Sequence, residues 1–231
     1  MLRESLRYNV LDMSGKVSWK LYGLVGGVLL TLCMFVLARA YSSFPGDEPA
    51  LVWFQGLQTG WLDTAALALD TIGGEPWAII LIAVAVVGLL ILRRPAQALI
   101  FVLSLAPLLI GHELKEIVDR PRPDYLLIGP EPESRSFPSG HSTYAMIFGG
   151  LLIYIAGDLI RSRLLRRWLQ GLLAALIFAM GASRVYLGVH WPSDVIGGFL
   201  LGGVALVGLI ALRYLLSDSK IVTLRRKISP W

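Results

Sequence analysis

The chain has 231 residues, of which 55% are hydrophobic, and a formal net charge of +5. Its mean hydropathy of +0.66 exceeds what a soluble domain of this size needs for its core, so the composition indicates an integral membrane protein. The charge does not indicate nucleic-acid binding, because the basic residues are distributed as in a membrane topology. A single cysteine, Cys33, excludes a disulfide within the chain and gives no sign of a cysteine metal site.

Six runs are long and apolar enough to cross a bilayer, which requires roughly 20 residues each. We predict spans at about 19–41, 77–93, 96–115, 142–160, 168–187 and 195–216. The sequence therefore predicts an all-α fold, a six-transmembrane-helix bundle that forms a single domain over residues 1–231.

The first predicted span could also be a signal peptide, since Ala38 and Ala40 have the spacing of a cleavage site. The apolar run before them is long for a signal peptide, and Arg39 interrupts the site. We therefore expect this span to remain uncleaved.

Residues 51–74, between the first two predicted spans, are too polar to cross the membrane comfortably. Their larger apolar side chains recur at helical spacing: Trp53, Phe54, Leu57, Trp61 and Leu62. This pattern favours a short helical segment that lies in the membrane interface. A helix on the aqueous side that packs against the bundle fits the pattern equally well.

The basic residues lie mainly on one side of the predicted topology. Of the 21 Lys and Arg residues, 15 fall on that side: Arg3, Arg7, Lys16, Lys20, Arg93, Arg94, Arg161, Arg163, Arg166, Arg167, Arg213, Lys220, Arg225, Arg226 and Lys227. The positive-inside rule places this side and both termini in the cytoplasm of a plasma-membrane protein. The loops around 42–76, 116–141 and 188–194 then face outward. We expect the basic segment 220–227 to contact anionic lipids of the inner leaflet.

Five of the six remaining basic residues lie at or near the outer loops: Lys115, Arg120, Arg122, Arg135 and Arg184. An anion site at the outer face explains this concentration, although cations at span ends can also reach lipid headgroups. Arg120 and Arg135 could be peripheral contacts to a phosphate or headgroup, or simply solvated.

Three polar stretches at the membrane edges can carry chemistry, and all three fall on the outer side: "KEIVDRPRP" (115–123), "PSGH" (138–141) and "SRVYLGVHWPSD" (183–194). In "PSGH", Ser139 is a good N-cap and Gly140 permits close backbone approach, so the helix that follows presents free N–H groups to an anion. His141 could donate a proton to a leaving oxygen. His112 lies inside the third span, where we expect a packing role.

In the third stretch, "SRVYLGVHWPSD", Asp194 follows His190 by four residues. A carboxylate there can accept a hydrogen bond from one imidazole nitrogen, which leaves the other nitrogen free as a nucleophile. Lys115, Arg122 and Arg184 add positive charge for the oxygens of a phosphoryl group.

Three motifs follow one another in the sequence. They are Lys115-x6-Arg122-Pro123, Pro138-Ser139-Gly140-His141 and Ser183-Arg184-x5-His190-x3-Asp194. In these motifs and their order the chain resembles the type 2 phosphatidic acid phosphatase family of membrane lipid phosphatases. The motifs occupy residues 115–194, and the predicted six-span layout extends the likeness over nearly the whole chain.

The resemblance implies a role for each motif residue. His190 would attack phosphorus and form a phosphohistidine, Asp194 would orient His190, and His141 would protonate the leaving group and then activate water. The phosphate would be bound by Lys115, Arg122, Ser139, Gly140 and Arg184. No metal or other cofactor is implied, and the sequence shows no carboxylate metal cluster in this region.

The implied function is a metal-independent phosphatase that acts on lipid phosphates at the outer leaflet. Candidate substrates are undecaprenyl pyrophosphate, phosphatidylglycerol phosphate and phosphatidic acid, and we favour the first, with broad specificity. A lipid phosphotransferase would carry the same motifs. The nearly uncharged span interiors disfavour a transporter or flippase, and the six spans disfavour a soluble haloperoxidase. The expected partners are the lipid substrate and the bilayer; the sequence does not indicate an oligomeric state.

Overall fold

The computed structural model of the protein describes residues 19–228. Over this range the chain forms α-helices and no strand, so the expected all-α class is confirmed. The helices are α1 (Trp19–Ala40), α2 (Asp47–Gln55), α3 (Gly60–Gly73), α4 (Glu75–Ile91), α5 (Pro95–Leu103), α6 (Leu105–Val118), α7 (Gly140–Leu159), α8 (Arg163–Tyr186) and α9 (Pro192–Ile228).

Five helical segments are long and apolar enough to cross a membrane. They are Leu21–Ala40, Pro95–Val118, Gly140–Leu159, Arg163–Tyr186 and Pro192–Leu215, and the second of them joins α5 to α6. A sixth span results if α3 and α4 are taken together, although they bend by 62° at their junction. The protein is therefore a multi-pass membrane protein, and the predicted count of six holds when the bent pair is one span.

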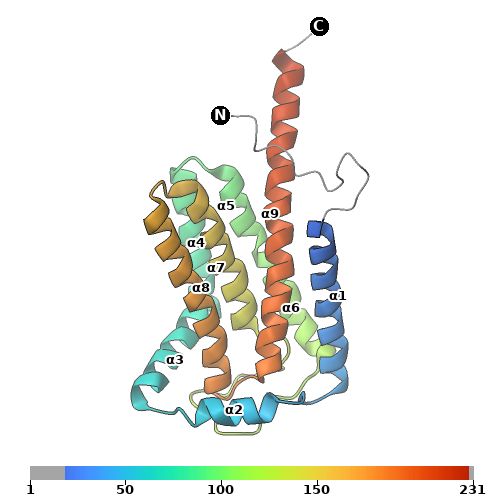
Figure 1. The fold of residues 1–231 in the computed structure, drawn as a ribbon, viewed down its shortest axis with the longest axis vertical. Helices are drawn as coiled ribbons and strands as arrows, with labels where there is room; N and C mark the ends of the chain where they lie inside the picture. The colour runs from blue at the N-terminus through green and yellow to red at the C-terminus, as the bar shows by residue number, and fades with distance from the viewer. Residues whose placement is uncertain (1–18, 229–231) are drawn as a thin grey trace.

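The helical segment expected between the first two spans is present as two helices, α2 and α3. They are separated by residues 56–59, where Gly56, and Gly60 just beyond, favour a break because glycine is a poor helix former. Trp53 and Trp61 are 61% and 71% exposed. Figure 1 shows α2 lying across the end of the bundle where α8 ends and α9 begins.

α7 packs closely against both α8 and α9, and glycines make these contacts possible. A Cβ added at Gly149 of α7 would lie 2.7 Å from Ile177 Cγ1 of α8. A Cβ added at Gly202 of α9 would lie 2.8 Å from Met146 Cβ of α7. Small residues at such positions let membrane helices approach one another, which fixes α7 between its neighbours.

The three motifs lie together at the end of the bundle next to α2. There α6 and α8 end, α7 and α9 begin, and residues 119–139 connect α6 to α7 without forming a helix (Figure 1). At the opposite end α9 continues beyond the other helices (Figure 1). The basic residues predicted to face the cytoplasm at 3–16 and in 220–227 lie outside the part whose side chains are described.

Candidate active site

His190 and Asp194 meet at the turn between α8 and α9. Gly188 in this turn has a φ of +76°, and a Cβ there would clash with the carbonyl oxygen of Leu126, so the turn requires glycine. Pro192 begins α9 and places Asp194 in its first turn. His190 Nδ1 lies 3.5 Å from Asp194 Oδ2, and both side chains are buried. The structure thus pairs the predicted nucleophile with the predicted orienting carboxylate.

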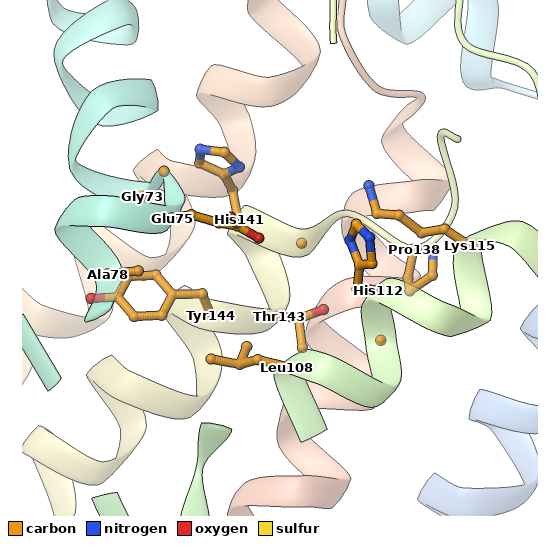
Figure 2. Close-up of a pocket in the computed structure, with 13 residues that line it drawn as sticks. Gly73, Glu75, Ala78, Leu108, His112, Lys115, Pro138, His141, Thr143 and Tyr144 are labelled. Carbon is orange, nitrogen blue, oxygen red and sulfur yellow. The ribbon is translucent and has the colours of Figure 1, made fainter. Parts of the chain in front are cut away.

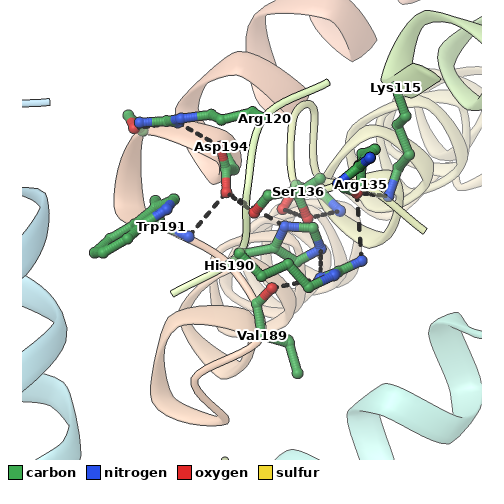
Figure 3. Close-up of polar contacts among 12 residues, drawn as sticks. Lys115, Arg120, Arg135, Ser136, Val189, His190, Trp191 and Asp194 are labelled. Atoms are coloured by element: carbon green, nitrogen blue, oxygen red, sulfur yellow. Dashed lines mark hydrogen bonds and ion pairs between the residues drawn. The ribbon is translucent and has the colours of Figure 1, made fainter. Parts of the chain in front are cut away.

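The Asp194 carboxylate accepts three hydrogen bonds (Figure 3). The Trp191 N–H, at 2.9 Å, and the Ser136 hydroxyl donate to Oδ2, and Arg120 Nη1 donates to Oδ1. Several donors of this kind hold a carboxylate in one orientation. His190 Nδ1 is buried and has no hydrogen-bond partner in the described part of the chain, so Asp194 is the group poised to accept from it.

Arg120 is buried, which corrects the expectation of a peripheral or solvated arginine. Its guanidinium bridges Asp194 to Asp47 at the start of α2, where Nη2 lies 3.0 Å from Oδ2. It also donates to Ser193 Oγ at 2.8 Å and lies 4.6 Å from the centre of the Phe44 ring. The motif alone could not reveal this environment, because Asp47 precedes Arg120 by 73 residues.

Lys115 and Arg122 converge on Ser134 in the connection between α6 and α7. Lys115 Nζ lies 3.3 Å, and Arg122 Nη2 3.2 Å, from Ser134 Oγ. Lys115 also donates to the carbonyl oxygen of Arg135 at 3.1 Å, whereas the Arg135 side chain is half exposed, as expected for a solvated residue. Arg122 Nη1 lies 3.4 Å from His190 Nε2. The structure therefore places Arg122 beside the nitrogen of His190 that faces away from Asp194.

Ser139 and Gly140 occupy different surroundings at the start of α7. Ser139 Oγ caps the helix by accepting from the Ser142 N–H at 3.4 Å and from the Ser142 hydroxyl at 2.9 Å. Ser139 is fully buried, and its own N–H donates to the Asp194 carbonyl oxygen at 3.1 Å. Gly140 is exposed and lines a cavity together with Arg122 and His190. Of the two residues predicted to bind phosphate through the helix start, the structure brings Gly140 to the cavity wall, whereas Ser139 connects α7 to Asp194.

Asp70 of α3 joins the group although it lies outside the three motifs. Its Oδ1 accepts a hydrogen bond from Arg184 Nη1 at 2.5 Å and lies 3.3 Å from His141 Nε2. Its carbonyl oxygen is 3.0 Å from the same histidine nitrogen. The signal that could have revealed it is an aspartate inside the apolar run "AALALDTIGG".

A cavity of about 230 Å³ lies between these groups. Its walls include most of the predicted site residues, together with Asp70: Lys115, Arg122, Gly140, His141, Arg184 and His190. A second cavity of about 180 Å³ shares Lys115, Gly140 and His141 with the first. Figure 2 shows this second cavity, with His141 and Glu75 on one side and Lys115 on the other.

His112 lines the second cavity and is exposed, so the expected packing role is not what the structure shows. Its neighbour Gly111 takes the side of α6 that faces α9, where an added Cβ would lie 3.5 Å from Leu201. Consecutive residues of a helix point about 100° apart, so His112 is directed away from that contact.

The electrostatic environment keeps His190 uncharged. Burial lowers the pKa of His190 well below its ordinary value of 6.5, and the charges of Lys115, Arg122 and Arg184 lower it further. Burial also lowers the pKa of Arg122 to about 10, which leaves its guanidinium protonated at neutral pH. A neutral imidazole beside protonated cations can act as a nucleophile toward an anion bound by those cations. Within residues 19–228, no cluster of three or more His, Cys, Asp or Glu side chains could hold a metal ion.

Comparisons with known proteins are consistent with this arrangement. The sequence profile of the PAP2 superfamily matches residues 95–217. Phosphatidylglycerophosphatase B of Bacillus subtilis is 33% identical over 147 residues, which cover 62% of this chain and 70% of that protein. Undecaprenyl-diphosphatase of Sulfolobus acidocaldarius is 39% identical over 35% of this chain and 34% of its own length. The crystal structure of a transmembrane PAP2-type phosphatidylglycerolphosphate phosphatase from Bacillus subtilis aligns with a TM-score of 0.73 and 25% identity, over 87% of this chain and 98% of that one.

Proposed function

This chain belongs to the PAP2 superfamily, and from that premise we propose that it hydrolyses lipid phosphates through a phosphohistidine at His190. Its relatives are named as phosphatases, and the protein is a phosphoric ester hydrolase. The observation that carries the detailed proposal is the setting of His190. Its Nδ1 faces Asp194, and its Nε2 lies beside Arg122 at a cavity walled by cations.

The phosphoryl group binds among Lys115, Arg122 and Arg184, next to Gly140 at the start of α7. Three cations and a helix N-terminus favour an anion at this point and stabilise the additional charge that its oxygens develop during transfer. Lys115 and Arg122 are already held by Ser134, so little reorganisation is needed when phosphate binds.

In the first step His190 Nε2 attacks phosphorus while the bond from phosphorus to the leaving oxygen breaks. Asp194 accepts a hydrogen bond from His190 Nδ1–H and stabilises the positive charge that develops on the imidazole. His141 donates a proton to the leaving oxygen. In the second step His141 takes a proton from water, whose oxygen attacks phosphorus and releases inorganic phosphate and free His190.

The second cavity supports a lipid as the substrate. It begins at His141, where the leaving group departs, and its walls are mainly small or apolar: Gly73, Gly74, Ala78, Leu108, Gly111 and Pro138. The lipid moiety can therefore extend from the phosphate site into a groove among α4, α6 and α7. The two cavities together therefore fit a terminal phosphate on a membrane lipid, as a monoester or a diphosphate, and we favour undecaprenyl pyrophosphate within a broad specificity.

The distribution of charge along the chain supports the orientation. Among the residues whose side chains are described, seven arginines lie toward the end of the bundle opposite the cavity: Arg93, Arg94, Arg161, Arg163, Arg166, Arg167 and Arg213. By the positive-inside rule that end is cytoplasmic, and the cavity opens on the outer side of the plasma membrane.

A direct assay tests the proposal. The protein is purified in detergent and offered undecaprenyl pyrophosphate, phosphatidylglycerol phosphate and phosphatidic acid in the presence of a chelator, beside His190→Ala. We expect free phosphate from the wild type without an added acceptor lipid, and a loss of about 10³-fold or more in the variant, because the nucleophile is gone. Release that requires an acceptor would indicate a phosphotransferase. Full activity of the variant would contradict the nucleophile assignment, and loss with chelator would contradict metal independence.

A further inference from the structure

Asp70 contacts two side chains that the proposed reaction uses. Its Oδ1 lies 2.5 Å from Arg184 Nη1 and 3.3 Å from His141 Nε2, and its backbone oxygen lies 3.0 Å from that same nitrogen. The Asp70 side chain is 28% exposed and lines the phosphate cavity, so it belongs to the wall of the site and not to the packed core.

These contacts determine which nitrogen of His141 is available for proton transfer. Nε2 is engaged by two oxygens of Asp70, and Nδ1 has no hydrogen-bond partner among the described residues. For Nδ1–H to act as an acid while Nε2–H donates to Asp70, the imidazole must carry both protons. The two Asp70 oxygens fix the plane of the ring and therefore the direction of Nδ1.

We propose that Asp70 is a positioning residue that holds His141 as the proton donor to the leaving group. The inference rests on the proposed function. In the first step the His190 Nε2–P bond forms, the bond from phosphorus to the leaving oxygen breaks, and the electron pair goes to that oxygen. The proton on His141 Nδ1 moves to the leaving oxygen, while Nε2–H stays bonded to Asp70. His141 is then neutral at Nδ1 and accepts the proton of the attacking water.

The leaving group provides a test that separates this role from a structural one. An alkoxide leaves only when it is protonated, whereas p-nitrophenolate leaves without a proton. The comparison uses kcat/KM, which reports the steps up to departure of the leaving group and excludes the later attack by water.

We expect Asp70→Asn to lower kcat/KM for phosphatidic acid by roughly 10- to 100-fold, since positioned acids contribute about 10²-fold or more to such rates. For p-nitrophenyl phosphate we expect a decrease of less than about threefold, and His141→Ala should show the same selective pattern. If the substitution acted through Arg184 instead, kcat/KM would fall equally for both substrates, because Arg184 would bind the phosphate that both share. Asp63→Asn is the matched control: it removes another carboxylate from α3, whose partner is the hydroxyl of Tyr186 outside the site.

Equal losses on both substrates, in a variant that unfolds at the wild-type temperature, would overturn the proposal, as would unchanged activity on phosphatidic acid. If Asp70→Asn unfolds at a lower temperature, Asp70→Glu keeps the charge and is expected to recover much of the rate on phosphatidic acid while p-nitrophenyl phosphate stays unaffected. No recovery relative to Asp70→Asn would overturn the proposal. Failure of the proposed function itself looks different, because the wild type would then release no phosphate or His190→Ala would remain active.

Discussion

Arg120 and Asp194 form an ion pair in which neither side chain exposes any surface. The same guanidinium binds Asp47 of α2, so one buried arginine connects the carboxylate beside His190 to the helix that crosses the end of the bundle. A cation is therefore shared between two carboxylates, and removal of the cation leaves both of them buried without their partner.

Arg120→Ala should destabilise the protein strongly. Removing one member of a buried charge pair costs about 3–5 kcal/mol, whereas a surface pair contributes less than about 1 kcal/mol. Arg135→Ala is the matched control, because Arg135 lies in the same connection and forms a half-exposed pair with Asp119. In detergent, the unfolding temperature should decrease strongly for Arg120→Ala and hardly at all for Arg135→Ala. Similar unfolding temperatures for the two would show that the buried network does not stabilise the fold.

Ser134→Ala should weaken binding of the phosphate. Its hydroxyl holds both Lys115 and Arg122, and a hydrogen bond to a charged group contributes about 1.5–3 kcal/mol. We expect KM to rise about tenfold with a smaller change in kcat, because the two cations remain present but are less well fixed. Ser162→Ala, which alters the cap of α8, is the control. A decrease in kcat alone would contradict this account.

The lowered pKa of His190 predicts how stability depends on pH. The unfolded chain binds a proton on this imidazole near pH 6.5, whereas the buried folded form stays neutral to a lower pH. The free energy of unfolding must therefore fall as pH decreases from about 6.5 toward the folded-state pKa. His190→Gln lacks this contribution, so the wild type should lose stability relative to the variant between about pH 7 and pH 5, as measured by thermal unfolding. If the wild type instead became more stable relative to His190→Gln as the pH was lowered, His190 would not have a lowered pKa in the folded protein.

Adjacent glycines of α9 should respond differently to alanine. A Cβ at Gly202 would lie 2.8 Å from Met146 Cβ and 2.9 Å from the Thr143 carbonyl oxygen, whereas one at Gly203 meets nothing within 4 Å. Overpacking of this kind costs about 1–3 kcal/mol, so Gly202→Ala should lower the unfolding temperature clearly and Gly203→Ala hardly at all. Equal effects would mean that α7 and α9 are not in close contact at this level.

The features that could be predicted from the sequence depend on local pattern. Hydropathy identified five spans because each is apolar over its own length, whereas the predicted span at 77–93 covers only α4 of the bent pair of α3 and α4. The pairing of His190 with Asp194 followed from a four-residue spacing across a turn. The convergence of Lys115, Arg122 and Arg184 followed from their placement on the same predicted side of the membrane. The burial of Ser139 was not foreseen, because a good N-cap residue can point its backbone N–H toward a ligand or, as here, toward another carbonyl group.

The contributions of α2 and α3 could not be predicted, because they depend on how these short helices dock against the bundle. Asp47 lies 73 residues from Arg120, and Asp70 lies 114 residues from Arg184, with no motif to connect either pair. In the sequence, Asp47 lies in the polar stretch "SSFPGDEP" and Asp70 is a single charged residue in the apolar run "AALALDTIGG". Only the packed structure shows that Asp47 is buried against Arg120, beside Asp194, and that Asp70 lines the cavity beside His141 and Arg184.

The central claim is that the phosphoryl group is carried by His190, and trapping the intermediate tests it most directly. His141→Ala should accept phosphate from ³²P-labelled p-nitrophenyl phosphate, which needs no proton donor, and should release it slowly because the base that activates water is missing. We predict an acid-labile, base-stable label on the peptide that contains His190, and no label when His190→Ala is added to the same chain. A label on any other residue, or phosphate release that persists without His190, would contradict the account.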